Sequence, residues 1–217
     1  MARTTEKKHL EISIFENSPY ITLRKPTNLH VMPIATPLSK GSMLVAEPFL
    51  GDPNFDRSVI LLCDHNAHGS FGLVLNQTTD VMLGDVLEET IYQDIPLYLG
   101  GPVEKNTLHF VHRRPDLIEG GGKVTEGVYW GGDFESVKTM LNLSQLGHED
   151  IRFFVGYSGW GGGQLEDELT QKAWYITPGK EKFVFSTPAQ GFWREVLKDM
   201  GGKYRSIAHY PVDPSLN

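Results

Sequence analysis

Cys63 and His65 are the residues of this sequence best suited to covalent chemistry, and they lie two positions apart. On a β-strand, side chains two positions apart point to the same face. A thiol activated by a neighbouring imidazole is the arrangement of thiol-dependent enzymes and redox sensors. One hypothesis therefore makes Cys63 a nucleophile and His65 its base. The competing expectation is that Cys63 is a buried apolar residue on a strand, with a thiol pKa at or above its ordinary value.

A glycine-rich segment, residues 156–166, holds a second group of polar and aromatic side chains. Its backbone N–H groups, just before an expected helix start at Gln164, would suit an anionic group. Trp160 is expected to bury its indole and so hold the segment in place. If the fold brings this segment against the end of the strand that carries His65, the polar residues of both would line one cleft. The candidate ligand-binding residues are Asn66, Asn76, Tyr157, Trp160, Gly161, Gly162, Gly163, Gln164 and Glu166.

The same residues also have a structural interpretation, because glycines often mark turns, tryptophans often pack in cores and asparagines often cap turns. The glycine-rich stretches complete no nucleotide-binding or hydrolase motif. A valine follows Gly122-Lys123 where a phosphate loop needs Ser or Thr, and Trp160 replaces the last glycine of a nucleophile elbow. Cys63 and His65 supply half of a metal site at most, so neither a metal nor a cofactor is expected.

Charge and composition restrict the classes of partner. The 217 residues include 20 Lys and Arg against 27 Asp and Glu, a formal net charge of -7. Nucleic-acid binding relies on concentrated Lys and Arg, so direct binding to duplex DNA is not expected. The single cysteine fits a reducing compartment, and neither a signal peptide nor a membrane-spanning apolar stretch is present. We therefore expect a cytoplasmic protein without membrane contact, whose partner is a small anionic ligand or another protein.

Short apolar runs separated by Gly, Pro, Asn and Asp predict an α+β fold. Strands follow one another without helices between them, which favours a bent, largely antiparallel sheet with a few flanking helices in a single domain. The predicted strands are residues 43–46, 59–63, 71–75, 97–99, 107–112, 123–130, 151–157, 173–176 and 182–185. The predicted helices are residues 83–89, 133–141 with Asp133 as the cap, 164–171, and a segment that begins at Thr187 and Pro188 and ends before Gly201.

Proline recurs every few residues up to Pro37, and little periodicity survives between the prolines. We therefore interpret residues 1–40 as an N-terminal extension, in which Leu10 to Phe15 is predicted to form a short strand or an arm lying on the body. Residues 41–204 form the predicted domain, and residues 205–217 form a C-terminal tail. The oligomeric state has no signature in the sequence.

Three stretches resemble the signatures of the bacterial AlgH/YqgE family. The first runs from Arg57 to Asn66 and on to Asn76, the second is the turn 99–103, and the third is the segment 156–166, with tryptophans beyond it. The resemblance covers residues 41–200 in order. It implies a cytoplasmic α+β protein from a family that carries the label of a transcriptional regulator, and it implies no catalytic residues. Most members of the family start near the first strand, so the extension departs from the common pattern.

Three functional hypotheses follow. A non-catalytic binding or regulatory module is favoured because no catalytic motif is complete in the sequence, and regulation would then act through another protein rather than through DNA. A thiol-dependent enzyme or redox sensor would use Cys63 and His65. A protein-interaction role would use the N-terminal extension or a face of the sheet.

Overall fold

The computed structural model describes residues 37–87, 91–186 and 190–211. The chain divides into two units, Met1–Ala35 and Thr36–Asn217, and the second contains all of the described residues. The strand predicted at Leu10 to Phe15, like the rest of the proposed extension up to residue 36, lies outside the described residues.

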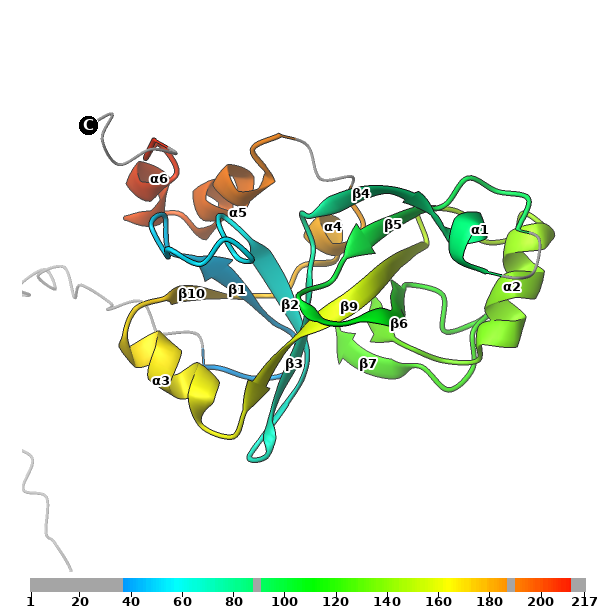
Figure 1. The fold of residues 1–217 in the computed structure, drawn as a ribbon, viewed down its shortest axis with the longest axis horizontal. Helices are drawn as coiled ribbons and strands as arrows, with labels where there is room; N and C mark the ends of the chain where they lie inside the picture. The colour runs from blue at the N-terminus through cyan, green and yellow to red at the C-terminus, as the bar shows by residue number, and fades with distance from the viewer. Residues whose placement is uncertain (1–36, 88–90, 187–189, 212–217) are drawn as a thin grey trace, which may run out of the picture. The chain divides into compact units, whose positions relative to one another are not determined.

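The second unit is built on a curled, largely antiparallel sheet (Figure 1). Its main path has the strand order β10-β1-β2-β3-β9-β6-β8-β7, and β4 and β5 form a branch in which β5 joins β9. Among the described residues, every strand pair is antiparallel except β5 with β9. The strands are β1 (Ser42–Ala46), β2 (Val59–Asn66), β3 (Gly69–Val74), β4 (Thr78–Met82), β5 (Pro96–Leu99), β6 (Val103–His112), β7 (Gly122–Thr125), β8 (Val128–Trp130), β9 (Ile151–Gly161) and β10 (Trp174–Pro178). The predicted α+β class is confirmed.

β9 is the strand on which the two parts of the sheet meet (Figure 1). Its first residues, 151–155, pair with β5 and β6, and its last residues, 158–161, pair with β3. Between them Gly156 has a φ of 66°, a conformation that favours glycine. Gly100 approaches this point so closely that a Cβ on it would lie 2.3 Å from the carbonyl oxygen of Gly156. The glycines of the 99–103 turn are therefore required where two backbones cross.

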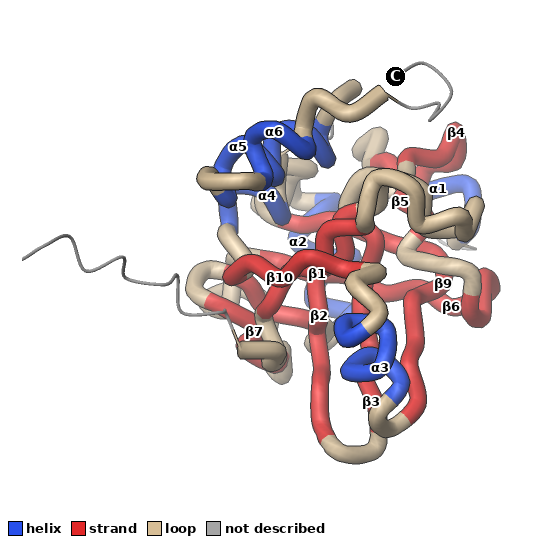
Figure 2. Tube along the Cα trace, turned by 90° about the vertical axis from the view of Figure 1, so that its left-hand side faces the viewer, coloured by secondary structure: helices blue, strands red, loops and turns tan. Residues whose placement is uncertain are grey.

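The helices gather in three places around the sheet. α5 packs against α6 and β1, α3 packs against β3, β9 and β10, and α1 lies beside β4 (Figures 1 and 2). The helices are α1 (Leu83–Val86), α2 (Phe134–Asn142), α3 (Gln164–Thr170), α4 (Glu181–Val184), α5 (Phe192–Met200) and α6 (Tyr204–Ile207). Among the described residues, no helix combines the length and the apolar character needed to cross a membrane.

Local sequence explains where α2 begins and where α5 ends. The Asp133 side chain accepts hydrogen bonds from the backbone N–H groups of Glu135 and Ser136, so the predicted N-cap of α2 is confirmed. α5 buries the apolar face that helical spacing predicted, and it ends at Gly201 with a φ of 74°. Its first residue is Phe192, later than the predicted start near Pro188; residues 187–189 lie outside the described residues.

Three other elements differ from the prediction. Residues 182–185 were predicted as a strand, but most of them belong to the short helix α4, in which Phe183 and Val184 are both buried. Consecutive buried residues suit a helical turn between packed elements better than a strand with one buried face. The predicted strand 123–130 is a hairpin of β7 and β8 that turns at Gly127, where φ is 70°. β4 was not predicted, because its residues are mostly exposed and show no apolar alternation.

Candidate functional site

Cys63 lies on β2 with no exposed surface, among the apolar side chains of the core. The pairing of β2 with β3 shifts register between Leu62 and Asp64, so Cys63 occupies a β-bulge. Its Sγ lies 3.8 Å from the carbonyl oxygen of Leu61. Burial raises the pKa of the Cys63 thiol far above its ordinary value, because the apolar core disfavours a thiolate. The expectation of a buried, apolar cysteine is confirmed, and this environment disfavours Cys63 as a nucleophile.

His65 lies at the tip of the β2–β3 hairpin, beside the last residues of β9. Its Nδ1 and the Ser70 Oγ are 2.8 Å apart, and its Nε2 lies 3.8 Å from Glu166 Oε1. β3 pairs directly with the end of β9, which continues into α3. The structure therefore brings the hairpin tip and the segment 160–166 together, which is the juxtaposition that the sequence hypothesis required.

The polar groups of this hairpin tip are occupied by one another. Gly161 N–H donates to Gln164 Oε1 at 3.0 Å, and the Asn66 side chain accepts a backbone N–H of its own turn at 2.8 Å. Gly162 packs so tightly on the hairpin turn that a Cβ on it would lie 2.6 Å from the carbonyl oxygen of Ala67. Figure 2 shows α3 beside β3 at this end of the sheet. An anion bound here would have to displace contacts that already exist.

Glu168, which the sequence did not single out, joins the tryptophans to α3. Trp160 Nε1 and Trp174 Nε1 donate to Glu168 Oε2 at 2.9 Å and 2.7 Å, and Gln164 Nε2 donates to Glu168 Oε1 at 3.0 Å. Trp160 is 7% exposed, so its expected burial is confirmed. These bonds fasten β9 and β10 to α3, which gives Trp160 and Gln164 a structural role.

Two of the candidate residues have other surroundings. Asn76 follows β3 at the far end of the hairpin from His65, where its Oδ1 accepts the Val59 N–H at 2.8 Å. The Tyr157 ring packs against Phe71, with centroids 4.9 Å apart. The structure therefore separates Asn76 from the hairpin tip and places it at the edge of a different hollow.

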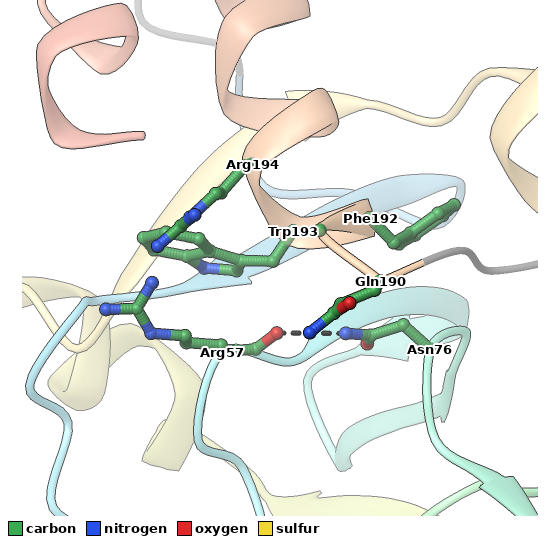
Figure 3. Close-up of a pocket in the computed structure, with 7 residues that line it drawn as sticks. Arg57, Asn76, Gln190, Phe192, Trp193 and Arg194 are labelled. Carbon is green, nitrogen blue, oxygen red and sulfur yellow. Dashed lines mark hydrogen bonds between the residues drawn. The ribbon is translucent and has the colours of Figure 1, made fainter. Parts of the chain in front are cut away.

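This hollow has a volume of about 580 Å³ and lies between Asn76 and the start of α5 (Figure 3). Three segments form it: the loop before β2, the loop after β3, and residues 190–194. Its lining residues are Arg57, Asn76, Gln190, Gly191, Phe192, Trp193 and Arg194. We call it the arginine hollow, because two of these residues are arginines and none is acidic.

Arg57 is held by contacts along its length. Its φ is 48°, an uncommon conformation for a residue with a side chain, and its carbonyl oxygen accepts Asn76 Nδ2–H at 2.9 Å (Figure 3). Its Cζ lies 4.6 Å from the centroid of the Trp193 ring. Its Nη2 donates to the carbonyl oxygen of Tyr210 at 3.1 Å and to that of Pro211. Its Nε is buried and has no hydrogen-bond partner among the described residues.

The first turn of α5 is fixed in the fold and adds backbone donors. Trp193 is 3% exposed, and its Nε1 donates to the carbonyl oxygen of Ala46 at 2.9 Å. Gly191 precedes the helix without a side-chain cap, and the first helical hydrogen bond to it comes from Glu195. The N–H groups of residues 192–194 therefore have no partner within the helix. Such groups, with the positive end of the helix dipole, attract anions.

The positive charge of Arg194 acts on the guanidinium group of Arg57. The pKa of Arg57 is lowered, first by burial and then by the positive charge of Arg194, while Asp56 acts in the opposite direction. Two like charges at one hollow repel each other, and a bound anion would relieve that repulsion.

Some of the residues that line this hollow were already noted in the sequence. Asn76 was a candidate residue, and Arg57 opens the first of the family-like stretches. Arg194 was not identified, because its distance from Arg57 along the chain says nothing about their proximity. The contact depends on how the start of α5 docks against the ends of β2 and β3.

Comparison with known families covers both regions. The family model described as AlgH-like (DUF179) matches residues 43–205, a span that includes the hairpin tip and the arginine hollow. The chain belongs to the AlgH-like family. The family suggested by the sequence signatures is therefore confirmed.

The relatives of this AlgH-like chain include proteins named UPF0301. One from Cytophaga hutchinsonii is 42% identical over 181 residues, which are 83% of this chain and 100% of that protein. One from Parabacteroides distasonis is 38% identical over 200 residues, 91% of this chain and 98% of that protein. The longer match reaches into residues 1–40, so part of the N-terminal segment is shared with that relative.

Two solved structures resemble this AlgH-like fold. The AlgH protein from Pseudomonas aeruginosa is 26% identical with a TM-score of 0.64, covering 83% of this chain and 98% of that one. The protein DIP2367 from Corynebacterium diphtheriae is 22% identical with a TM-score of 0.68, covering 81% of this chain and 94% of that one. The second likeness concerns the fold alone.

Proposed function

We propose that this chain is a non-catalytic binding module that captures a small ligand with a phosphate or carboxylate group in the arginine hollow. The observation that carries the proposal is the convergence of Arg57 and Arg194 on one hollow at the start of α5, where none of the described lining residues is acidic. Guanidinium groups and free helix N–H groups are the donors that proteins use for phosphate and carboxylate.

The composition of the lining also supports a role in binding rather than catalysis. The described residues of the lining include no Cys, His, Ser, Asp or Glu, so they supply no ordinary nucleophile and no general base. The fully buried Cys63 lies elsewhere, in the core. A regulatory role would follow if ligand binding altered a contact with another protein; the net charge of -7 gives no support for direct DNA reading.

Titration calorimetry with inorganic phosphate as the probe tests this proposal. The full chain should bind phosphate, and Arg194→Gln should weaken binding about 10- to 100-fold, because a hydrogen bond to a charged group contributes about 1.5–3 kcal/mol. Phosphate at about 100 times its Kd should also stabilise the chain by about 2.7 kcal/mol, which raises Tm by about 5–10 °C.

The matched control is Arg205→Gln, which removes an exposed arginine on α6 outside the hollow. This control should leave the phosphate affinity unchanged. Equal weakening by both substitutions, or no phosphate binding by the unsubstituted chain, would show that the arginine hollow is not an anion site.

A further inference from the structure

Large apolar side chains are exposed mainly at one end of the sheet. Among the described residues, seven such side chains are exposed to solvent, and five of them belong to β4, α1, the segment before β5 and the C-cap of α2. The exposed fraction reaches 79% for Tyr92 and 60% for Leu143. Single exposed apolar residues are ordinary, but a group of them on one surface marks an interaction site. We call this group the apolar patch, and its members are Val81, Met82, Val86, Tyr92 and Leu143.

Hydrogen bonds hold the segments of the apolar patch together. The N–H of Leu83, the first residue of α1, donates to the carbonyl oxygen of Ile95 at 2.8 Å. The N–H of Tyr92 donates to Asn142 Oδ1, at the end of α2, at 3.2 Å. Residues 92–95 therefore connect α1 with α2, and both helices lie at the same end of the sheet (Figure 1). The buried side chains of α1, β5 and α2 belong to one apolar cluster, so a packed core supports the patch.

The charges beside the apolar patch are acidic. Three aspartates are exposed on the segments that form it, and the sequence from residue 58 to residue 104 contains no Lys or Arg. The one lysine of α2, Lys138, is 9% exposed, and its Nζ lies 2.9 Å from Glu135 Oε1. Electrostatic complementarity therefore favours a partner that carries Lys or Arg beside its own apolar residues. The exposed aspartates are Asp80, Asp85 and Asp94.

The same charges disfavour other occupants of the patch. Two copies of this chain that faced each other through the patch would bring the aspartates of both copies together, and the net charge of -7 adds to that repulsion. An anionic lipid surface and a nucleic-acid backbone would be repelled as well. A protein segment with both apolar and basic side chains matches the apolar surface and the acidic charges at once.

We propose that the apolar patch is a docking surface for a basic, amphipathic segment of a partner protein. Apolar side chains of that segment cover Val86, Tyr92 and Leu143, and its Lys or Arg side chains pair with the exposed aspartates. Tyrosine is among the residues that contribute most to binding energy at interfaces, so Tyr92 is the main anchor of this surface. The proposal does not rest on anion binding, because no residue of the patch lines the arginine hollow.

Site-specific photo-crosslinking in the cells that naturally produce the chain identifies the occupant. The full chain carries p-benzoylphenylalanine in place of Tyr92, and a matched control carries it in place of Phe49, an exposed aromatic residue outside the patch. We expect position 92, and not position 49, to cross-link to a peptide of another protein that contains apolar residues and several Lys or Arg. No cross-link beyond that of the control, a cross-link to a second copy of this chain, or a captured peptide without basic residues would each overturn the proposal.

Fluorescence anisotropy with a labelled amphipathic peptide of Leu and Lys, about 18 residues long, gives a second readout in solution. Tyr92→Ser should weaken binding of this peptide about 10-fold or more, because it removes the main anchor, whereas Phe49→Ser should not. Asp94→Asn should weaken binding and reduce its salt dependence, whereas Asp167→Asn, at an exposed aspartate on α3, should do neither. No binding by the unsubstituted chain, or equal effects within either pair of variants, would overturn the proposal.

Arg194→Gln separates this surface from the arginine hollow. That substitution should weaken phosphate binding and leave the affinity for the Leu and Lys peptide unchanged, so each proposal can fail without the other. If Arg194→Gln weakened peptide binding as strongly as Tyr92→Ser, the apolar patch would not be the docking surface.

Discussion

The backbone of Arg57 has a conformation that glycine or asparagine would adopt at a lower energetic cost. Such strain costs about 1–3 kcal/mol and persists only where neighbouring groups impose it. Here Asn76 imposes it, because one amide binds the Arg57 carbonyl oxygen and the Val59 N–H together. At the scale of the residue, Asn76 therefore acts as a positioning residue for Arg57, whose guanidinium carbon lies 4.6 Å from the centroid of the Trp193 ring.

Cys63 allows a direct prediction at the same scale. Its burial raises the pKa of the thiol, so alkylation by iodoacetamide should be slow in the folded chain from pH 6 to pH 9 and should be limited by opening of the core. In denaturant the same thiol should react at the rate of an ordinary cysteine, with the usual rise in rate with pH. Fast alkylation of the folded chain at pH 6 would instead indicate an activated thiolate and revive the enzyme hypothesis.

Residue chemistry was predictable from the sequence where it depended on local context. The apolar run around Cys63 indicated burial, and the spacing around Asp133 indicated a helix cap, and both are confirmed. The pairing of Trp160 and Trp174 with Glu168, and of Arg57 with Trp193, was not predictable, because these contacts depend on the docking of elements that are far apart in the chain.

At the scale of elements, α3 is fastened to the sheet by Glu168. Glu168→Gln keeps the size of the side chain but removes the charge that two indole N–H groups share, so we expect a loss of about 2 kcal/mol in unfolding free energy and a fall in Tm of about 4–8 °C. The control is Glu166→Gln, because the Glu166 carboxylate is 51% exposed and lies 3.8 Å from His65; a change below about 1 kcal/mol is expected there.

Thermal unfolding of both variants measures this difference. Phosphate binding at the arginine hollow should be the same in both, since α3 does not contribute to its lining. Equal stability of the two variants would mean that the Glu168 bonds only replace bonds to water and do not fasten α3.

The strands that the sequence predicted well are the buried, β-branched runs, such as the one in β2. The two elements that were not predicted correctly, β4 and α4, differ from these runs for physical reasons. β4 presents a mostly exposed edge to solvent and so lacks an apolar pattern, while α4 has an apolar pattern too short to specify its period. The carbonyl oxygens of Val184 and Ser186 are bound by Arg152 from β9, so tertiary contacts fix this segment more than its own propensity does.

For the whole molecule, the net charge of -7 repels an approaching anion, whereas the local clustering of arginine attracts it. The overall field repels polyanions at distances up to about a Debye length, roughly 8 Å at physiological salt. Inside the arginine hollow, the positive charges of Arg57 and Arg194 and the start of α5 would dominate the field at the proposed ligand, because all three line the hollow. On the proposed function, this combination would favour small anions over a long phosphate backbone, because the backbone would also meet the negative charges of the chain.

Binding of duplex DNA tests this balance of charges for the whole molecule. We expect a labelled duplex of about 25 base pairs to bind no more tightly than about 1 µM at physiological salt, because the 27 Asp and Glu of the chain outnumber its 20 Lys and Arg. Fluorescence anisotropy at two salt concentrations measures this affinity, and Arg194→Gln should leave it unchanged. A complex well below micromolar that weakens steeply with salt would require a basic surface on this chain. If Arg194→Gln also weakened that complex, the arginine hollow would be a phosphate-backbone contact, and direct DNA binding would replace the proposed capture of a small ligand.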